Sequence, residues 1–158
     1  MTANVIVTVE REFEDSPDRV FRAWTEPSEL CQWRGSPGWH VEQETLSGEL
    51  QLGGRHRHVK IRDDDPSARV GTEGVYTEFF PPEVFVSREI ITGDAGIDEH
   101  VPLELRVEFT RTGRKGTLIR IIQGPYEQPE AEKHGEGWER EMGRLSQYLQ
   151  DAGRGATQ

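Results

Sequence analysis

Val5, Val7, Val9 and Phe13 follow a period of two between residues 5 and 13, and this alternation predicts a first strand. Ser16 followed by Pro17 breaks the pattern in the way that is typical of the start of a helix. Two short helices are therefore expected, one from Pro17 to Trp24 and one from Ser28 to Trp33, ahead of a loop rich in glycine and proline.

The middle of the chain repeats the alternation of a strand several times. The pattern predicts strands at about 39–46, 54–62, 70–80, 83–91, 101–111 and 116–123. Short polar segments rich in Asp, Gly and Pro separate these strands. Connections of this length join antiparallel neighbours, so we expect one antiparallel sheet.

The period changes to that of a helix near residue 130. Apolar residues then recur every three or four positions, at Trp138, Met142, Leu145 and Leu149. Gly153 is expected to end this helix, and residues 153–158 to form a disordered tail. No internal repeat or linker interrupts the pattern, so residues 1–152 are predicted to form a single domain.

The order of these elements predicts an α+β architecture. A curved antiparallel sheet of about six to seven strands has one apolar face to cover, and the C-terminal helix is the only long amphipathic element. We therefore expect the sheet to wrap around this helix, with the two short helices at one end and a cavity between helix and sheet.

Charge and cysteine content narrow the classes of partner. The 158 residues include 29 acidic and 19 basic ones, and the net charge of −10 disfavours nucleic acid and membrane surfaces as partners. No apolar run is long enough to span a membrane, and no secretion signal is expected at the N-terminus. The lone Cys31 suits a reducing compartment, so a cytoplasmic location is expected.

Four stretches carry a resemblance to a known family. They read SPDRVFRAWTEPSELCQW at 16–33, LGGRHRHVKI at 52–61, GTEGVYTEFFPPEVFV at 71–86 and GWEREMGRLSQYL at 137–149. The sequence resembles the helix-grip superfamily of START domains, and within it the family named for homologues of the activator of the Hsp90 ATPase. This resemblance implies a helix-grip fold that holds a hydrophobic or amphipathic ligand between the long helix and the sheet.

The chain departs from the family pattern at three positions of the expected cavity. His56 and His58 share one face of their strand, at positions where the family usually carries aromatic residues, and Arg88 also stands at a position that is often aromatic. The two histidines and Arg88 are therefore expected to point inward and to make the cavity more polar. The full set of residues expected to bind the ligand is Trp24, Trp33, His56, His58, Tyr76, Val86, Arg88, Leu105, Val107, Ile121, Trp138 and Met142.

The two histidines fit three kinds of site: a metal site, a catalytic acid or base, and the polar wall of a binding cavity. A metal would need a third ligand, for which Glu73, Glu78 or His100 are the candidates, and no metal or other cofactor is expected. A cyclase- or aromatase-like enzyme that uses an inward histidine as acid or base is the alternative to a binding protein. The preferred interpretation is that the histidines form hydrogen bonds in a partly polar, ligand-binding cavity.

The sequence raises two further interpretations about protein partners, namely a second copy of the chain and a chaperone ATPase. Leu118 and Ile122 lie opposite the inward residues of the last strand, and an exposed apolar patch there would favour a homodimer. Interaction with a chaperone ATPase is a third interpretation. The resemblance weakens it, because the eukaryotic co-chaperones of the family carry a further N-terminal domain that is not expected in this chain.

Overall fold

The computed structural model describes the backbone of residues 5–156 and the side chains of residues 5–153. In chain order its elements are β1 (Val5–Phe13), α1 (Pro17–Thr25), α2 (Pro27–Trp33), β2 (Trp39–Val41), the 3₁₀ helix η1 (Gln43–Thr45), β3 (Ser47–Gly48), β4 (Arg55–Arg62), β5 (Asp65–Phe80), β6 (Val84–Thr92), β7 (Leu103–Thr112), β8 (Gly116–Tyr126) and α3 (Gln128–Ala156). The described residues thus form an α+β fold.

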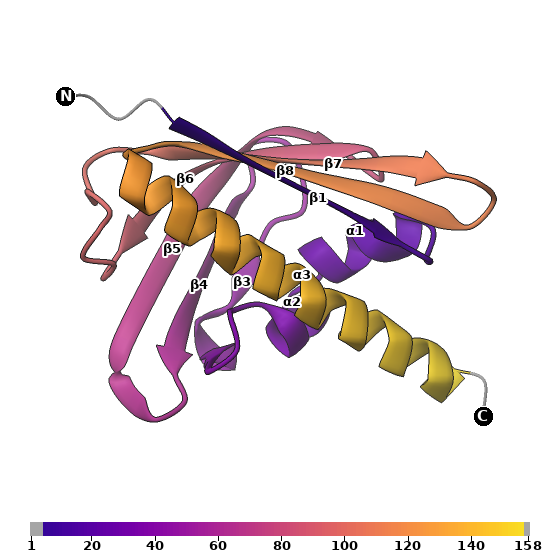
Figure 1. Cartoon of the computed structure of the whole chain (residues 1–158), viewed down its shortest axis with the longest axis horizontal. Coiled ribbons are helices and arrows are strands. Elements are labelled where there is room, and N and C mark those ends of the chain that lie inside the picture. Colours follow the sequence, from indigo (N-terminus) through magenta and orange to yellow (C-terminus); the bar gives the residue numbers. More distant parts are fainter. Residues whose placement is uncertain (1–4, 157–158) are drawn as a thin grey trace.

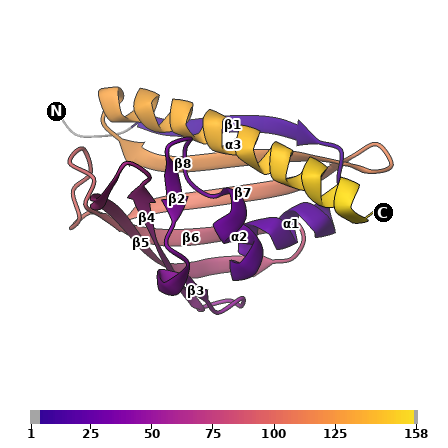
Figure 2. The ribbon, with the colours of Figure 1, turned by 90° about the horizontal axis from the view of Figure 1, so that it is seen from below.

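The strands form one antiparallel sheet in the order β1-β8-β7-β6-β5-β4-β2, and the two-residue strand β3 also pairs with β4. The sheet curves, and the long helix α3 lies diagonally across its concave side (Figure 1). Seen from below, α3 runs along β1, while α1 and α2 lie beside its C-terminal half (Figure 2). This arrangement is the helix-grip fold that the order of elements predicted.

The start of α1 follows the sequence signal. The Ser16 hydroxyl accepts a hydrogen bond of 3.3 Å from the backbone N–H of Arg19, and Pro17 occupies the first helical position. The expected strand over 39–46 is wrong in its second half, because the chain there forms β2, then η1, then β3. The Thr45 hydroxyl accepts from the backbone N–H of Val59 at 2.9 Å, which fastens this segment to β4.

Helix α3 covers the sheet with one apolar stripe. Trp138, Met142, Leu145 and Leu149 are all buried, as their spacing predicted. The expected end of the helix at Gly153 is wrong, because α3 continues to Ala156 and residues 157–158 lie outside the described part of the chain. Gly153 has a helical backbone, so glycine here acts as an ordinary helix position rather than as a terminator.

The core lies between α3, α1, α2 and the concave face of the sheet. Its aromatic residues include Phe21, Trp24, Trp33, Phe85 and Phe109, whose rings meet mostly edge to face. None of the helices in the described part of the chain is long and apolar enough to cross a membrane.

Candidate functional site

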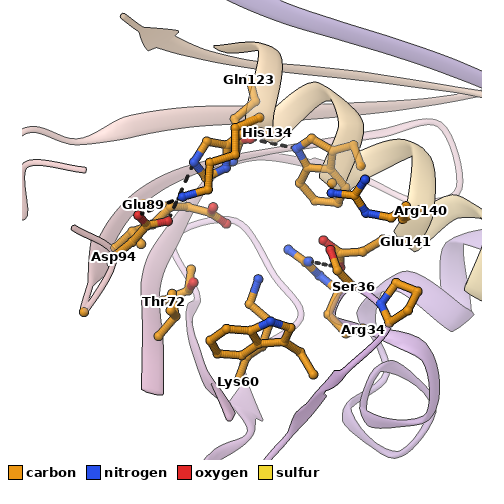
Figure 3. A pocket seen from close by; sticks show the side chains of 18 of the residues that line it. Arg34, Ser36, Lys60, Thr72, Glu89, Asp94, Gln123, His134, Arg140 and Glu141 are labelled. Atoms are coloured by element: carbon orange, nitrogen blue, oxygen red, sulfur yellow. Dashed lines mark hydrogen bonds and ion pairs between the residues drawn. The ribbon is translucent and has the colours of Figure 1, made fainter. Parts of the chain in front are cut away.

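A cavity of about 460 Å³ opens between the N-terminal half of α3 and the concave faces of β4, β5 and β6. Its lining side chains converge from α3, from the strands and from the loop after α2 (Figure 3). The residues that line it are Arg34, Ser36, Pro37, Trp39, Lys60, Val70, Thr72, Glu89, Ile91, Gly93, Asp94, Ala95, Gln123, Lys133, His134, Gly137, Trp138, Arg140 and Glu141. The volume falls within the range of about 300–1,000 Å³ that is usual for small-molecule sites.

One wall of the cavity is a buried ion pair between Arg34 and Glu141. The Arg34 guanidinium donates to the Glu141 carboxylate, and the backbone N–H of Gly35 donates to the same oxygen at 2.8 Å. The guanidinium also lies 4.6 Å from the ring centre of Trp138, a cation–π contact. Burial raises the pKa of Glu141, but the charges of Arg34 and Lys60 and the hydrogen bonds from Gly35 and Arg34 together lower it below its usual value, so the carboxylate is charged at neutral pH.

Lys60 brings a second positive charge into the cavity. Its side chain is half-buried and points from β4 toward the cavity centre (Figure 3). Burial lowers its pKa, and the charge of Glu141 opposes that shift. Among the residues whose side chains are described, Lys60 forms no ion pair or hydrogen bond, so this ammonium group is open to an incoming anion or acceptor.

Glu89 on β6 faces the same space. It is 3% exposed, and burial raises the pKa of its carboxyl group to about 7, although the charge of Arg34 and a hydrogen bond from Ser87 oppose the rise. Ser87 also lies 2.6 Å from Nε2 of His56, which stands 3.7 Å from the Glu89 carboxylate. Glu89 is therefore the group in the cavity that changes charge near neutral pH.

Both predicted histidines are on the concave side of the sheet, but neither of them lines this cavity. Burial lowers the pKa of His56 to about 4, with a smaller contribution from Arg34, so this imidazole is neutral over the physiological range. His58 is buried more deeply, its pKa is also lowered by burial, and its Nε2 has no hydrogen-bond partner in the described part of the chain. Of the two rings, His56 is the one that contacts a residue of the cavity wall, through its approach to Glu89.

Most of the residues expected to bind ligand belong to the solid core instead. Trp138 lines the cavity, and it donates a hydrogen bond of 2.7 Å from Nε1 to Gln123. The others that are packed in the core cluster are Trp24, Trp33, Tyr76, Leu105, Val107, Ile121 and Met142.

Two of the expected inward residues lie on the opposite face of β6. Arg88 is exposed and Val86, although buried, alternates with the inward residues Phe85 and Ser87 and stands outside the core cluster. The prediction that Arg88 charges the cavity is wrong, and the cations that line it are Arg34 and Lys60 together with Lys133 and Arg140 at the rim.

The structure does not assemble a metal site around the two histidines. Glu73 and His100 are exposed, and Glu78 is paired with Arg106.

Leu118 and Ile122 are only half-exposed, and Arg120 between them pairs with Glu10 at 2.9 Å. The outer face of β8 is therefore an ion-paired surface rather than the exposed apolar patch that was expected.

Lys60 and Glu141 were not predicted as functional groups, although the sequence pattern contains weak evidence for both. Lys60 follows His56 and His58 at the same period of two, so it shares their face. Glu141 lies three residues after Trp138, on the buried stripe of α3. A charged residue on a predicted core face is the signal that would have found both of them.

Comparison with known proteins finds one matching family model. The family model described as "Activator of Hsp90 ATPase homolog 1-like protein" matches residues 15–150. No curated protein matches the chain.

Solved structures share the fold at low sequence identity. Protein CV1439 from Chromobacterium violaceum is 19% identical with a TM-score of 0.78, over 89% of this chain and 94% of that one. The AHSA1-like protein from Aeromonas hydrophila is 22% identical with a TM-score of 0.69, over 94% of each chain. DynU16, a protein of the dynemicin biosynthetic locus, is 20% identical with a TM-score of 0.70, over 92% of this chain and 47% of its own.

Proposed function

The chain belongs to the Activator of Hsp90 ATPase homolog 1-like family, and from the cavity in its helix-grip fold we propose that it binds a small amphipathic molecule. The molecule carries an anionic or hydrogen-bond-accepting head group. The observation that carries the proposal is the Lys60 ammonium group, which points into the cavity and has no partner among the described side chains. Transferring a charge from water into protein is unfavourable unless another group compensates it, and the ligand head supplies that compensation.

The rest of the cavity suits the remainder of such a molecule. Val70, Ile91 and Trp138 supply apolar contact surface, while Thr72 and Gln123 add neutral polar groups to the lining. Arg34 and Glu141 neutralise each other, so they contribute little net charge to the cavity. Because Glu89 has a pKa of about 7, it becomes neutral below that pH and then no longer offsets the charge of Lys60. Anion binding is therefore expected to strengthen as the pH falls from 8 to 6.

Titration of ¹⁵N-labelled protein with decanoate tests the location of binding. We expect saturable shifts of the backbone amides of Thr72, Ile91 and Gly137 around the cavity. A second pocket, which lies on the outer face of the sheet next to Val75 and Arg88, serves as the internal control and is expected to stay unchanged. Shifts confined to that outer pocket, or none that saturate, would refute the proposal.

An acid–base enzyme is the second candidate, and the environment of Glu89 favours it. A carboxyl group with a pKa of about 7 can remove a proton from a carbon atom next to a bound carbonyl group, and the Lys60 ammonium can stabilise the enolate oxygen that forms. This assigns the proton transfer to Glu89 rather than to His56 or His58, because neither of these histidines lines the cavity and the pKa of about 4 makes His56 a weak base. DynU16 belongs to a biosynthetic locus, which agrees with such a role without specifying a substrate.

Deuterium exchange tests the enzymatic candidate. In D₂O, the protein is expected to accelerate exchange of the central C–H of an amphipathic 1,3-diketone above the buffer rate, as followed by NMR. Glu89→Gln abolishes this acceleration, whereas Glu99→Gln, at an exposed position, leaves it intact. Exchange at the buffer rate in the unaltered protein would leave ligand binding as the function.

A further inference from the structure

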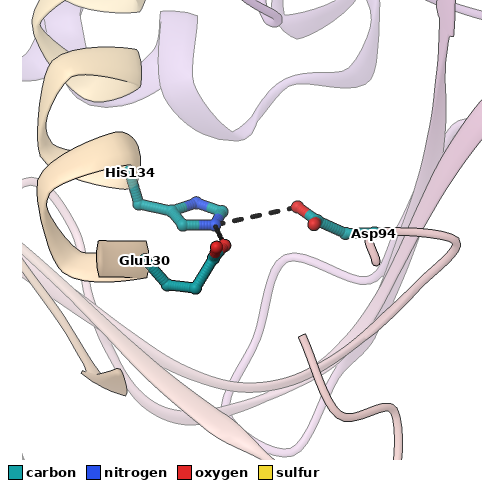
Figure 4. A group of neighbouring side chains, drawn as sticks. All are labelled: Asp94, Glu130 and His134. Atoms are coloured by element: carbon teal, nitrogen blue, oxygen red, sulfur yellow. Dashed lines mark ion pairs between the residues drawn. The ribbon is translucent and has the colours of Figure 1, made fainter. Parts of the chain in front are cut away.

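Three side chains at the rim of the cavity place their ligand-type atoms together. Asp94 comes from the loop after β6, and Glu130 and His134 lie one turn apart at the start of α3 (Figure 4). The carboxylate and imidazole atoms lie within 4.8 Å of one another. In the described part of the chain, this is the only group of three or more such residues with that spacing.

The distances distinguish this group from an ordinary hydrogen-bonded cluster. Nε2 of His134 lies 3.5 Å from Oε1 of Glu130 and 3.7 Å from Oδ2 of Asp94. Hydrogen bonds between such atoms span about 2.7–3.2 Å, so both contacts are too long. Two ligands bound tetrahedrally to one metal at about 2.1 Å lie about 3.4 Å apart, which is close to the observed spacing.

The two central atoms also lack hydrogen-bond partners in the described part of the chain. Oε1 of Glu130 and Nε2 of His134 are shielded from solvent, and neither forms a hydrogen bond with a described residue. A neutral imidazole can offer the lone pair of one ring nitrogen to a metal ion. A carboxylate oxygen and an imidazole nitrogen that face each other at 3.5 Å without a hydrogen bond are suitable ligand atoms for a cation.

The ring of His134 is held in place for this role. It stacks on Tyr126 with a centroid distance of 4.6 Å and an interplanar angle of 12°. Tyr126 is buried, and its hydroxyl group has no hydrogen-bond partner in the described region. A metal-bound water molecule is one acceptor that would satisfy such a hydroxyl group.

We propose that Asp94, Glu130 and His134 form a binding site for a divalent first-row transition metal ion such as Zn²⁺. One nitrogen and two carboxylate ligands suit this class of ion, and three protein ligands leave a coordination position open. Asp94 and His134 also line the cavity, so the open position adjoins the space described above. The site depends on these three residues and not on the identity of the cavity ligand.

The ammonium group of Lys133 competes with a metal ion for the carboxylates of Asp94 and Glu130. Its Nζ atom lies 3.8 Å from Oδ1 of Asp94 and 3.9 Å from Oε1 of Glu130, so it supplies positive charge to the same carboxylates. The Lys133 side chain is 62% exposed, which lets it swing into solvent when a metal binds. Removing its charge is therefore expected to tighten metal binding.

Calorimetric titration of the metal-free full-length protein with ZnCl₂ tests the site, with circular dichroism to establish that each variant is folded. We expect one ion per chain. Asp94→Asn, Glu130→Gln and His134→Phe, which retains an aromatic ring against Tyr126, should each weaken binding about tenfold or more. Lys133→Ala should tighten it.

Two controls separate the site from adsorption to an acidic surface. Glu136→Gln removes an exposed charge from the same helix, and His40→Gln removes an exposed histidine that pairs with Asp63. Both should bind Zn²⁺ as the unaltered protein does. The site is refuted if no saturable binding occurs, if Asp94→Asn and His134→Phe bind unchanged, or if Glu136→Gln weakens binding to the same extent as they do.

Discussion

A single carboxylate oxygen of Glu141 on α3 accepts hydrogen bonds from both the guanidinium group of Arg34 and the backbone N–H of Gly35. These contacts join the middle of the C-terminal helix to the loop that follows α2. Arg144, one turn later, donates to the backbone oxygens of Gly35 and Trp39 at 2.9 and 2.8 Å. The loop that closes one side of the cavity is thus fixed to the helix by charged side chains instead of by apolar packing.

Removal of one partner of this pair is expected to be costly. Glu141→Ala leaves the buried Arg34 charge without compensation and should lower the free energy of unfolding by about 3 kcal/mol. The double variant Arg34→Met, Glu141→Leu removes both charges and should recover most of that loss. Urea denaturation of the single and double variants measures the coupling, and strictly additive losses would contradict it.

The pH dependence of stability reports on Glu89. Its pKa rises from 4.5 to about 7 on folding, so the folded protein binds more protons than the unfolded chain between these values. The contribution of Glu89 to stability therefore falls as the pH rises from 4.5 through 7. Relative to the unaltered protein, Glu89→Gln should gain about 3 kcal/mol across this window. Urea denaturation at several pH values measures the difference.

A matched control isolates that effect. Glu99 is exposed on the loop between β6 and β7, and Glu99→Gln is expected to follow the pH profile of the unaltered protein. A Glu89→Gln profile parallel to that of the unaltered protein would contradict the raised pKa.

The buried His58 makes an opposite contribution. Its pKa lies well below 6.5 in the fold, so the stability that depends on its neutral form is present above pH 6.5 and is lost as the pH falls below it. His58→Leu also removes an unpartnered buried nitrogen, and should raise the free energy of unfolding by about 1 kcal/mol at pH 7 and by more at pH 5. Urea denaturation at both pH values checks this, with the exposed His100→Gln as the control. Lower stability at both pH values would show that the imidazole has a partner.

Helix α3 is required to cover the concave face of the sheet. A chain that ends at Glu127 lacks Trp138, Met142, Leu145 and Leu149, all of which are buried. It is expected to lose cooperative thermal unfolding, as followed by circular dichroism. Cooperative unfolding equal to that of the full chain would contradict the role of α3 as the cover of the core.

The periodic segments explain why the fold could be predicted. The stripe on α3 and the alternation in β1 each fit only one type of element, so they determined the order of elements and hence the architecture. Strand β6 is ambiguous, because apolar residues occupy both phases of VFVSREII. The choice of Val86 and Arg88 as inward residues therefore failed, and Glu89 was missed.

The candidate site was less accessible from the sequence because its parts come from distant segments. Arg34 lies 107 residues before Glu141, and no local pattern announces their contact. Asp94 and His134 likewise meet only when the loop after β6 folds against α3. Pairings of this kind depend on the tertiary fold, which periodicity alone does not specify at the level of side chains.

The charge preference of the cavity tests the central claim most directly. Isothermal titration at pH 6 with decanoate and with decanol, which share a chain length, should show decanoate binding about tenfold more tightly because Lys60 supplies a charge-assisted hydrogen bond. Lys60→Met should abolish or reverse this preference, while Lys115→Met, at an exposed turn, should preserve it. Equal affinities for both ligands, or a decanoate preference that survives Lys60→Met, would contradict the account.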